Sequence, residues 1–176
     1  PVREMCAVGM PVDIERRNDI SIEMRKRIDL LTNDFKKEVK QELNPRSPKQ
    51  IKDYLTEKRI KLPKKYDKKT GMYKESADAS AIKRIRLKHP EMKELLYLQE
   101  IKSLEKALSS YIDFDIRPDG RLSYSLNITG TETLRGSGNK DGWGRGFNIQ
   151  TTPRGERIKQ MFLSPEGFSF VEGDVF

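Results

Sequence analysis

The residue types that most often perform catalysis are scarce in this sequence. It contains one cysteine, Cys6, and one histidine, His89. A Ser-His-Asp triad, a Cys-His pair or a zinc cluster is therefore nearly impossible to assemble from it. His89 comes directly before Pro90, where a helical pattern stops, and we interpret it as an exposed helix-end residue without chemistry. Carboxylates and basic side chains are the remaining candidates.

A carboxylate stands at the end of one apolar segment. Residues 168–174 predict a buried strand that ends in Asp174. Magnesium prefers oxygen ligands and usually takes one or two protein carboxylates together with substrate phosphates, so this aspartate fits half of a phosphoryl-transfer site. One carboxylate is not a catalyst, and on the residues alone an ordinary exposed acid is the preferred interpretation of Asp174.

The second chemical feature is a basic segment between Lys49 and Lys74. This segment contains ten basic residues and three acidic ones, within a chain of net charge +8 and pI near 9.5. A solvated charged face is the ordinary explanation. Here Tyr54, Tyr66 and Tyr73 interleave with the lysines, which favours contact with a nucleic-acid backbone. The lysines expected to contact DNA are Lys49, Lys52, Lys64, Lys65, Lys68 and Lys69.

Two long helical patterns would position this chemistry. Residues 13–43 contain neither proline nor glycine, and their apolar spacing predicts an amphipathic helix about 45 Å long, with Asp13 as its N-cap. A second helix is predicted over 91–112, as an antiparallel partner of the first. The expected core positions are Ile20, Met24, Ile28, Leu31, Phe35 and Val39 in the first helix and Tyr97, Ile101, Leu104, Leu108 and Tyr111 in the second.

Shorter elements are expected between these two helices. Residues 48–58 predict a short helix capped by Ser47, with Gln50 completing a capping box. Residues 61–75 are rich in lysine and predict an exposed loop. A further short helix, which begins at Ser76 or Asp78, would then lead to the proline stop.

The composition changes after Phe114, where glycine, proline, serine and threonine become frequent. Alternating apolar and polar residues over 121–126 predict a half-buried strand. The five glycines of 136–146 predict a flexible loop, in which Trp143 is either a stacking residue or a local hydrophobic anchor. The 176-residue chain is therefore expected to be α+β, with a helical part over 1–113 followed by the first strands of a second part.

Seven short motifs follow one another along the chain. They are PVD at 11–13, NPRSPKQI at 44–51, GRL at 120–122, TETLR at 131–135, FNIQ at 147–150, RIK at 157–159 and GD at 173–174. Their order resembles that of the family A DNA polymerases related to bacterial DNA polymerase I, and the phage-type members in particular. The likeness spans almost the whole chain.

The resemblance implies that the chain contains parts of two polymerase subdomains. Residues 1–113 would form the thumb, two long antiparallel helices with a small basic tip that grips duplex DNA, and residues 114–176 would form the start of the palm. Asp174 matches the catalytic, metal-binding aspartate of motif A. The complete enzyme would hold two Mg²⁺ ions. The resemblance places Arg121 near the primer terminus. The residues that it places beside the duplex are Thr131, Thr133, Arg135, Asn148 and Gln150. Asn127 is a further candidate, because its amide can donate to acceptors in the minor groove.

The partners implied are primer-template DNA and deoxynucleoside triphosphates. The fingers and the distal palm would come from the rest of a longer chain or from a second polypeptide, and this fragment alone is expected to be inactive. A runner-up hypothesis is a non-catalytic basic DNA-binding or replication accessory module. A coiled helical interaction protein is a weaker third, because the apolar stripe does not keep a strict seven-residue repeat.

Location is the last expectation from sequence. No apolar run approaches the roughly 20 residues that a membrane-spanning helix requires. The single cysteine and the lack of a signal peptide favour the cytoplasm, which would be the host cytoplasm for a phage-encoded protein.

Overall fold

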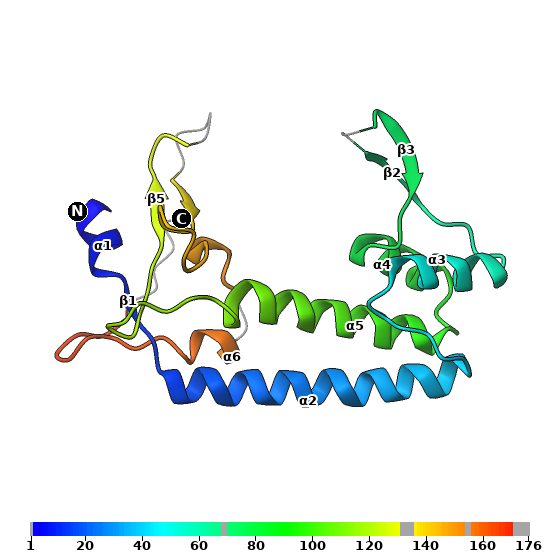
Figure 1. Cartoon of the computed structure of the whole chain (residues 1–176), viewed down its shortest axis with the longest axis horizontal. Coiled ribbons are helices and arrows are strands. Elements are labelled where there is room, and N and C mark those ends of the chain that lie inside the picture. Colours follow the sequence, from blue (N-terminus) through cyan, green and yellow to red (C-terminus); the bar gives the residue numbers. More distant parts are fainter. Residues whose placement is uncertain (1, 68–69, 131–135, 154–155, 171–176) are drawn as a thin grey trace. The chain divides into compact units, whose positions relative to one another are not determined.

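The computed structural model describes residues 2–67, 70–130, 136–153 and 156–170 (Figure 1). Its helices are α1 (Val2–Val8), α2 (Ile14–Val39), α3 (Pro48–Glu57), α4 (Ala79–Lys88), α5 (Lys93–Ala107) and α6 (Glu156–Lys159), with a π-helical turn η1 (Leu108–Ile112) and a 3₁₀ turn η2 (Ile149–Thr151). Its strands are β1 (Met10–Pro11), β2 (Lys64–Asp67), β3 (Met72–Glu75), β4 (Arg121–Leu122), β5 (Ser125–Asn127) and β6 (Ser137–Asn139). The expected α+β class is confirmed.

The strands form three small antiparallel sheets, each of two strands. β1 pairs with β4, β2 with β3, and β5 with β6. Across the described part of the chain, every helix is too short or too polar to cross a membrane.

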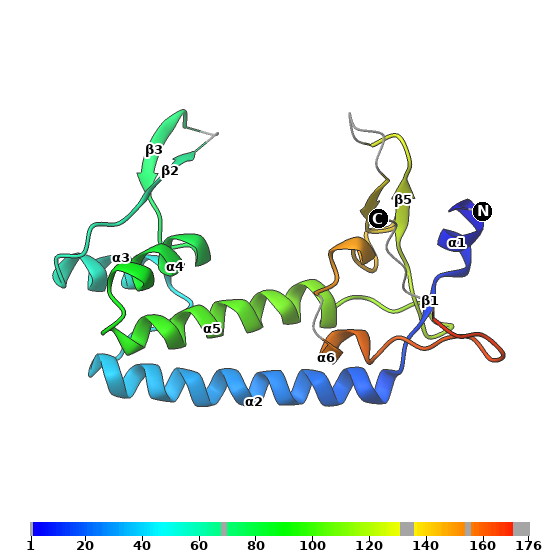
Figure 2. The same cartoon turned by 180° about the vertical axis from the view of Figure 1, so that it is seen from behind.

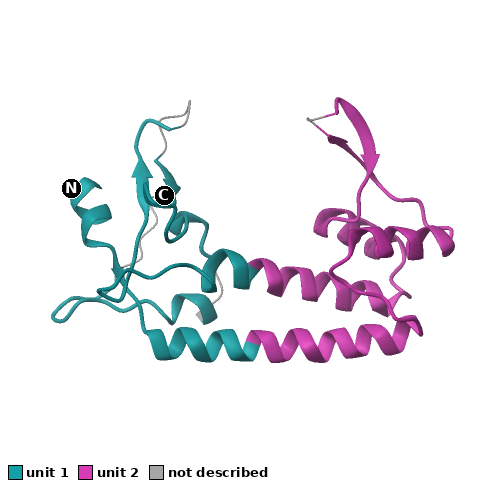
Figure 3. Ribbon diagram, in the orientation of Figure 1, with its two compact units in different colours: residues 1–23, 107–176 teal, residues 24–106 magenta. Residues whose placement is uncertain are grey.

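The chain divides into two compact units, residues 24–106 and residues 1–23 with 107–176 (Figure 3). Helix α2 contributes to both of them. The first 23 residues thus pack with the C-terminal segment, whereas the sequence predicted a linear boundary at 113/114. The assignment of 1–113 to a thumb and 114–176 to a palm stays a prediction.

Helix α2 forms as its periodicity predicts. The six expected core residues, from Ile20 to Val39, are all buried. The backbone N–H of Arg16 donates to Asp13 Oδ1 at 2.8 Å, so Asp13 is the N-cap. Within unit 24–106, α5 runs antiparallel to α2 (Figure 1), and Arg27 Nε donates to Glu100 Oε1 at 2.9 Å across the pair.

The buried face of the second long helix matches the prediction in part, because the expected Ile101 and Leu108 are buried and the other three residues are not. Leu95, Leu98 and Ile101 fill the core of unit 24–106, while Tyr97 and Leu104 stay partly exposed. Aliphatic side chains can be buried without a polar partner, whereas a tyrosine hydroxyl needs one. In the other unit, Tyr111 is likewise only partly buried, and its hydroxyl donates to the Thr151 carbonyl at 2.7 Å.

The short helices begin where the sequence predicts. Ser47 Oγ accepts from the Gln50 backbone N–H, and Asp78 caps α4 by accepting from the Ala81 N–H at 2.9 Å. The predicted capping box is wrong in one detail. Gln50 Oε1 accepts from the Asn44 N–H at 2.8 Å, and Ser47 N donates instead to the Asn44 carbonyl.

Within the segment predicted as an exposed loop at 61–75, residues 64–67 and 72–75 form the paired strands of a β-hairpin. Lys65 pairs with Lys74 and Tyr66 with Tyr73, and the Ser76 N–H closes the base by donating to the Pro63 carbonyl. In Figure 1 and Figure 2 the hairpin extends away from α3 and α4. Cross-strand pairing between aromatic residues stabilises it, and this pairing is not visible in a composition dominated by lysine.

The core of the other unit surrounds Phe147. Its ring packs edge-on against Phe114, with ring centroids 5.1 Å apart, and against Tyr111 at 5.3 Å. Arg17 joins helix α2 to this core, because its Nε donates to the Ile112 carbonyl at 2.7 Å and its guanidinium lies 4.8 Å from the Phe114 ring centroid.

Three expectations for the C-terminal half need correction. The strand predicted over 121–126 is split into β4 and β5, and the loop predicted over 136–146 contains strand β6. Phe168 and Phe170 belong to no strand and are 72% and 59% exposed, so the described part of 168–174 is not a buried strand. Among the described residues no strand pairs with 168–170, so no neighbouring strand covers its aromatic rings.

Candidate nucleic-acid interface

The hairpin β2–β3 sorts its side chains onto two faces, because neighbouring strand residues point to opposite sides. On one face the like charges of Lys65 and Lys74 stand opposite each other, which is unfavourable alone. Lys65 Nζ donates to Asp78 Oδ2 at 2.8 Å, and Lys74 Nζ donates to Asp67 Oδ2 at 2.9 Å. Both cations on this face are therefore engaged with carboxylates.

The pairing of Lys65 with Asp78 has an electrostatic consequence. The ammonium of Lys65, together with the Ser80 hydroxyl and the Ala81 N–H, holds the pKa of Asp78 well below its usual range. Asp78 remains charged at neutral pH and acts as N-cap and counter-ion at once. Lys65, which was predicted as a DNA contact, is thus partly committed to the protein.

The opposite face of the hairpin carries Lys64, Tyr66 and Tyr73. The two tyrosine rings form an edge-to-face pair with centroids 5.4 Å apart. Both rings are well exposed. Glu75 stands opposite Lys64 on this face, but among the described residues Lys64 forms no ion pair, so its charge is available to a ligand.

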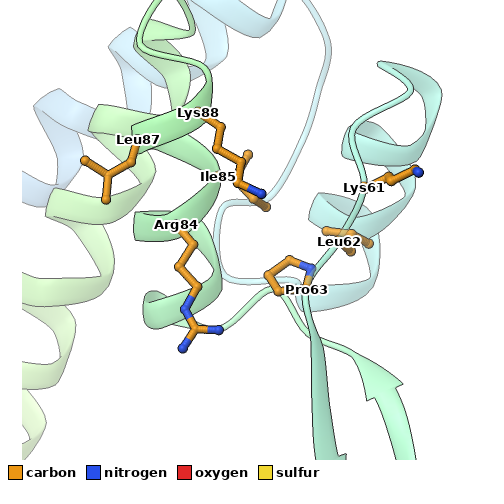
Figure 4. Close-up of a pocket in the computed structure, with 7 residues that line it drawn as sticks. All are labelled: Lys61, Leu62, Pro63, Arg84, Ile85, Leu87 and Lys88. Atoms are coloured by element: carbon orange, nitrogen blue, oxygen red, sulfur yellow. The ribbon is translucent and has the colours of Figure 1, made fainter.

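Helix α4 adds cations beside the hairpin. A pocket of about 430 Å³ lies between α4 and the segment that leads into β2, and Figure 4 shows the residues that line it. They are Lys61, Leu62, Pro63, Arg84, Ile85, Leu87 and Lys88. The sequence-based prediction missed Arg84 and Lys88. Their spacing of four residues on one helix is the signal that points to a shared basic face.

Of the other predicted tip lysines, Lys49 is exposed and Lys52 half-buried on α3. Lys68 and Lys69 lie outside the described residues. The structure therefore brings Lys64 and Lys65 together on one hairpin and gives them different surroundings.

The predicted amides Asn148 and Gln150 meet at strand β6. The Gly138 N–H donates to Gln150 Oε1 at 2.7 Å, and Gln150 Nε2 donates to the Gly136 carbonyl at 3.1 Å. Asn148 caps η2 by accepting from the Gln150 N–H at 3.0 Å. A Cβ on Gly138 would lie 2.1 Å from Asn148 Oδ1, so only glycine allows this approach. The glycines of this segment thus serve close packing and not only mobility.

The side chains of Asn127 and Arg121 already form hydrogen bonds within the protein. Asn127 Oδ1 accepts from the Thr129 N–H at 3.0 Å at the end of β5, which pairs with β6. Arg121 reaches the carbonyl of Val8 at the end of α1, at 3.5 Å. Both side chains keep further donors, so these contacts do not prevent them from binding DNA.

Trp143 is 82% exposed, which decides against a local hydrophobic anchor. Asp141 holds the turn beneath it by accepting from the backbone N–H groups of Trp143 and Arg145, at 3.0 and 2.8 Å. The Arg145 guanidinium lies 4.9 Å from the Trp143 ring centroid. The indole is therefore presented on an ordered turn, as a stacking residue would be.

Several predicted site residues lie outside the described residues, namely Thr131, Thr133, Arg135 and Asp174. Within the described ranges, no three His, Cys, Asp or Glu side chains come together to hold a metal ion. Asp174 lies outside those ranges and stays a predicted ligand.

Comparison with known proteins shows which protein family the sequence matches. The sequence model of DNA polymerase family A matches residues 14–175. The DNA polymerase of Escherichia phage T5 is 28% identical over 182 residues, a match that covers 95% of this chain and 20% of the phage protein. The thermostable DNA polymerase I of Thermus aquaticus is 29% identical over 181 residues, covering 97% of this chain and 20% of the relative.

A solved structure shows the same fold. The POL domain of Pol1 from M. smegmatis, in complex with DNA primer-template and dNTP, matches with a TM-score of 0.66 at 26% identity. The match covers 96% of this chain and 29% of that chain. The present chain thus spans about a fifth of the length of its curated relatives.

Proposed function

Because this chain belongs to DNA polymerase family A, we propose that it is the part of a template-directed DNA polymerase that grips primer-template DNA and supplies one catalytic carboxylate. The observation that supports this most is the match of nearly the whole chain to a polymerase domain bound to primer-template and dNTP. Primer-template DNA and deoxynucleoside triphosphates are the proposed partners of the whole enzyme.

In this proposal residues 1–113 are the thumb, and unit 24–106 carries its DNA-gripping tip. The cations of that unit bind phosphates, which supply affinity and position without sequence information. Lys49, Lys52 and Lys64 are proposed contacts with no carboxylate partner among the described residues, whereas Lys65 first has to leave Asp78 or share it. The same role is proposed for Lys68 and Lys69.

Residues 114–176 are the proposed start of the palm. The amides of Asn127, Asn148 and Gln150 can donate to the acceptors of the minor groove, which look similar in every base pair and suit a sequence-independent enzyme. Gly138 holds the last two amides in fixed positions. Arg121 is proposed to lie near the primer terminus, and Thr131, Thr133 and Arg135 are proposed to line the duplex beside it.

Asp174 is the proposed metal ligand. A bound Mg²⁺ pair would activate the primer 3′-hydroxyl and stabilise the leaving pyrophosphate. This chain's own part in that chemistry is to hold the duplex so that the primer end stays beside the Asp174 carboxylate. The fingers and distal palm have to come from outside residues 1–176.

DNA binding by the chain is the first test. A fluorescence-anisotropy titration with primer-template DNA should show binding of little sequence preference. Its affinity should fall with salt at a log–log slope of about 0.9 per phosphate neutralised. Absence of binding at low salt, or binding that ignores salt, contradicts the proposal.

Catalysis is the second test and needs the complete enzyme, with fingers and distal palm fused or added. Asp174→Asn should lower primer extension by several orders of magnitude and leave the Kd for DNA almost unchanged. Near-normal extension by this variant would remove Asp174 from the chemistry. DNA binding without extension by any completed form would instead favour a non-catalytic accessory module.

A further inference from the structure

The tyrosine face of hairpin β2–β3 is built as a stacking surface. Tyr66 is 51% and Tyr73 70% exposed, although the two rings touch across the strands. The ladder between β2 and β3 fixes their backbone. Two rings held in place but open to solvent offer flat apolar faces to a ligand, and they contribute little to the core.

A groove leads from α4 to these rings. The pocket of Figure 4 continues into a second pocket of about 280 Å³, and Pro63 and Arg84 line both of them. The second pocket is also lined by Lys64, Lys65, Tyr66 and Asp78. Volumes of this size accept small-molecule groups such as a nucleotide. The groove therefore reaches Tyr66, whose ring is paired with that of Tyr73.

The groove is also positively charged. Besides Lys65, its cations are Lys61, Lys64, Arg84 and Lys88. Within the part of the chain that the structure describes, none of these four forms an ion pair. Lys65 lines the second pocket together with Asp78, with which it is paired. The groove thus holds four cations whose charge is not neutralised by a described carboxylate, beside one ion pair.

We propose that this groove binds single-stranded DNA, with unpaired bases stacked on Tyr66 and Tyr73 and the phosphates beside Lys64 and Arg84. The combination of a cationic groove with exposed aromatic rings is the physical basis of sequence-tolerant single-strand binding. A duplex keeps its base faces inside the stack, so it could present only phosphates and groove edges to these rings. The inference rests on the proposed function and adds a second DNA substrate to it.

The test compares two probes on the full chain at one salt concentration, a fluorescein-labelled oligo(dT) and a blunt duplex of equal phosphate number. The double variant Tyr66→Leu, Tyr73→Leu should bind oligo(dT) roughly tenfold more weakly or worse, because stacked bases lose their aromatic partners. Duplex binding should change less than twofold. Arg84→Gln should weaken oligo(dT) binding as well, by removing a phosphate contact.

Matched controls separate stacking from general damage. Tyr66→Phe, Tyr73→Phe keeps the rings and should keep oligo(dT) binding. Phe168→Leu removes an exposed aromatic ring from the other unit, and Lys26→Gln removes an exposed cation from α2. Both should bind oligo(dT) as the unmodified chain does. Melting curves confirm that the variants are folded, and photo-crosslinking of bromodeoxyuridine-containing oligo(dT) should modify Tyr66 or Tyr73.

The outcomes distinguish the two proposals. Equal losses for oligo(dT) and duplex, or an equal loss in the phenylalanine variant, overturn the stacking role. A chain that binds duplex but not oligo(dT) overturns this inference alone. A chain that binds neither probe at low salt overturns the proposed DNA grip together with it.

Discussion

Lys65 of strand β2 donates to Asp78 Oδ2 at 2.8 Å, while the other oxygen of Asp78 accepts from the first turn of helix α4. One carboxylate therefore joins the hairpin to the helix. The pair is largely open to water, with side-chain exposures of 70% and 34%. Its contribution to stability is that of a surface ion pair, about 0.2–1 kcal/mol.

Lys65→Gln should therefore lower stability slightly and change its pH dependence. The pKa of Asp78 is depressed in the folded chain by Lys65, so the stabilisation exists above the unfolded-state pKa and is lost as pH falls through the folded one. The variant raises the folded pKa, and its midpoint of acid unfolding should move to higher pH. Circular dichroism between pH 7 and pH 2 measures it.

Lys64→Gln is the matched control for this variant, because Lys64 precedes Lys65 on the same strand and has no carboxylate partner among the described residues. Its acid midpoint should stay where it is, while its DNA affinity should fall more than that of Lys65→Gln. A larger acid shift for Lys64→Gln would contradict the role given to Asp78.

Tyr54→Phe should destabilise the chain. The Tyr54 hydroxyl donates to Glu94 Oε1 at 2.8 Å, and both side chains are buried. Burial, reinforced by Glu94, raises the pKa of Tyr54, so the hydroxyl remains a donor at neutral pH. Without the Tyr54 hydroxyl, the buried Glu94 carboxylate loses this hydrogen-bond donor. The free energy of unfolding should fall by about 1–3 kcal/mol.

A double-mutant cycle in urea unfolding checks this prediction. Tyr54→Phe combined with Glu94→Leu replaces both polar groups by apolar ones and should recover much of the loss. Additive losses in the cycle would show that the hydrogen bond is not the cause.

Gly138→Ala should disturb the amide cluster, because the new Cβ would lie 2.1 Å from Asn148 Oδ1 and 3.3 Å from Gln150 Oε1. The amides have to move, so both stability and duplex affinity should fall. Gly136→Ala is the control, since a Cβ at Gly136 would meet only Gln150 Nε2 at 3.8 Å. Thermal melting and anisotropy titration of the two variants should differ clearly, and equal behaviour would contradict the close approach.

Arg17→Leu should loosen the junction between α2 and the end of η1. Arg17 donates from Nε to the Ile112 carbonyl and from Nη2 to the Phe114 carbonyl, both at 2.7 Å. The substitution leaves two partly buried carbonyls without this donor, for a loss of about 1–3 kcal/mol. Arg17→Lys keeps the charge but not the planar fork and should recover only part of it. Urea unfolding measures both, and full recovery by lysine would contradict the two-carbonyl bridge.

The sequence by itself determined the regular helices and the family. The spacing from Ile20 to Val39 left one face for α2 to bury, and Asp13 and Asp78 marked helix starts through local cap chemistry. The order of short motifs identified the family, and the match over 14–175 confirmed it. These features depend on neighbouring residues or on linear order, which a sequence displays directly.

Tertiary structure alone decided which side chains are free to act. Lys64 and Lys65 are identical and adjacent and both line the second pocket, yet Lys65 pairs with Asp78 and Lys64 does not, because strand alternation directs neighbouring side chains to opposite sides. The contact between Gly138 and Asn148 depends in the same way on a packing of distant segments. A hydrogen bond or a close approach between residues far apart in the chain leaves no periodicity, so only the folded chain reveals it.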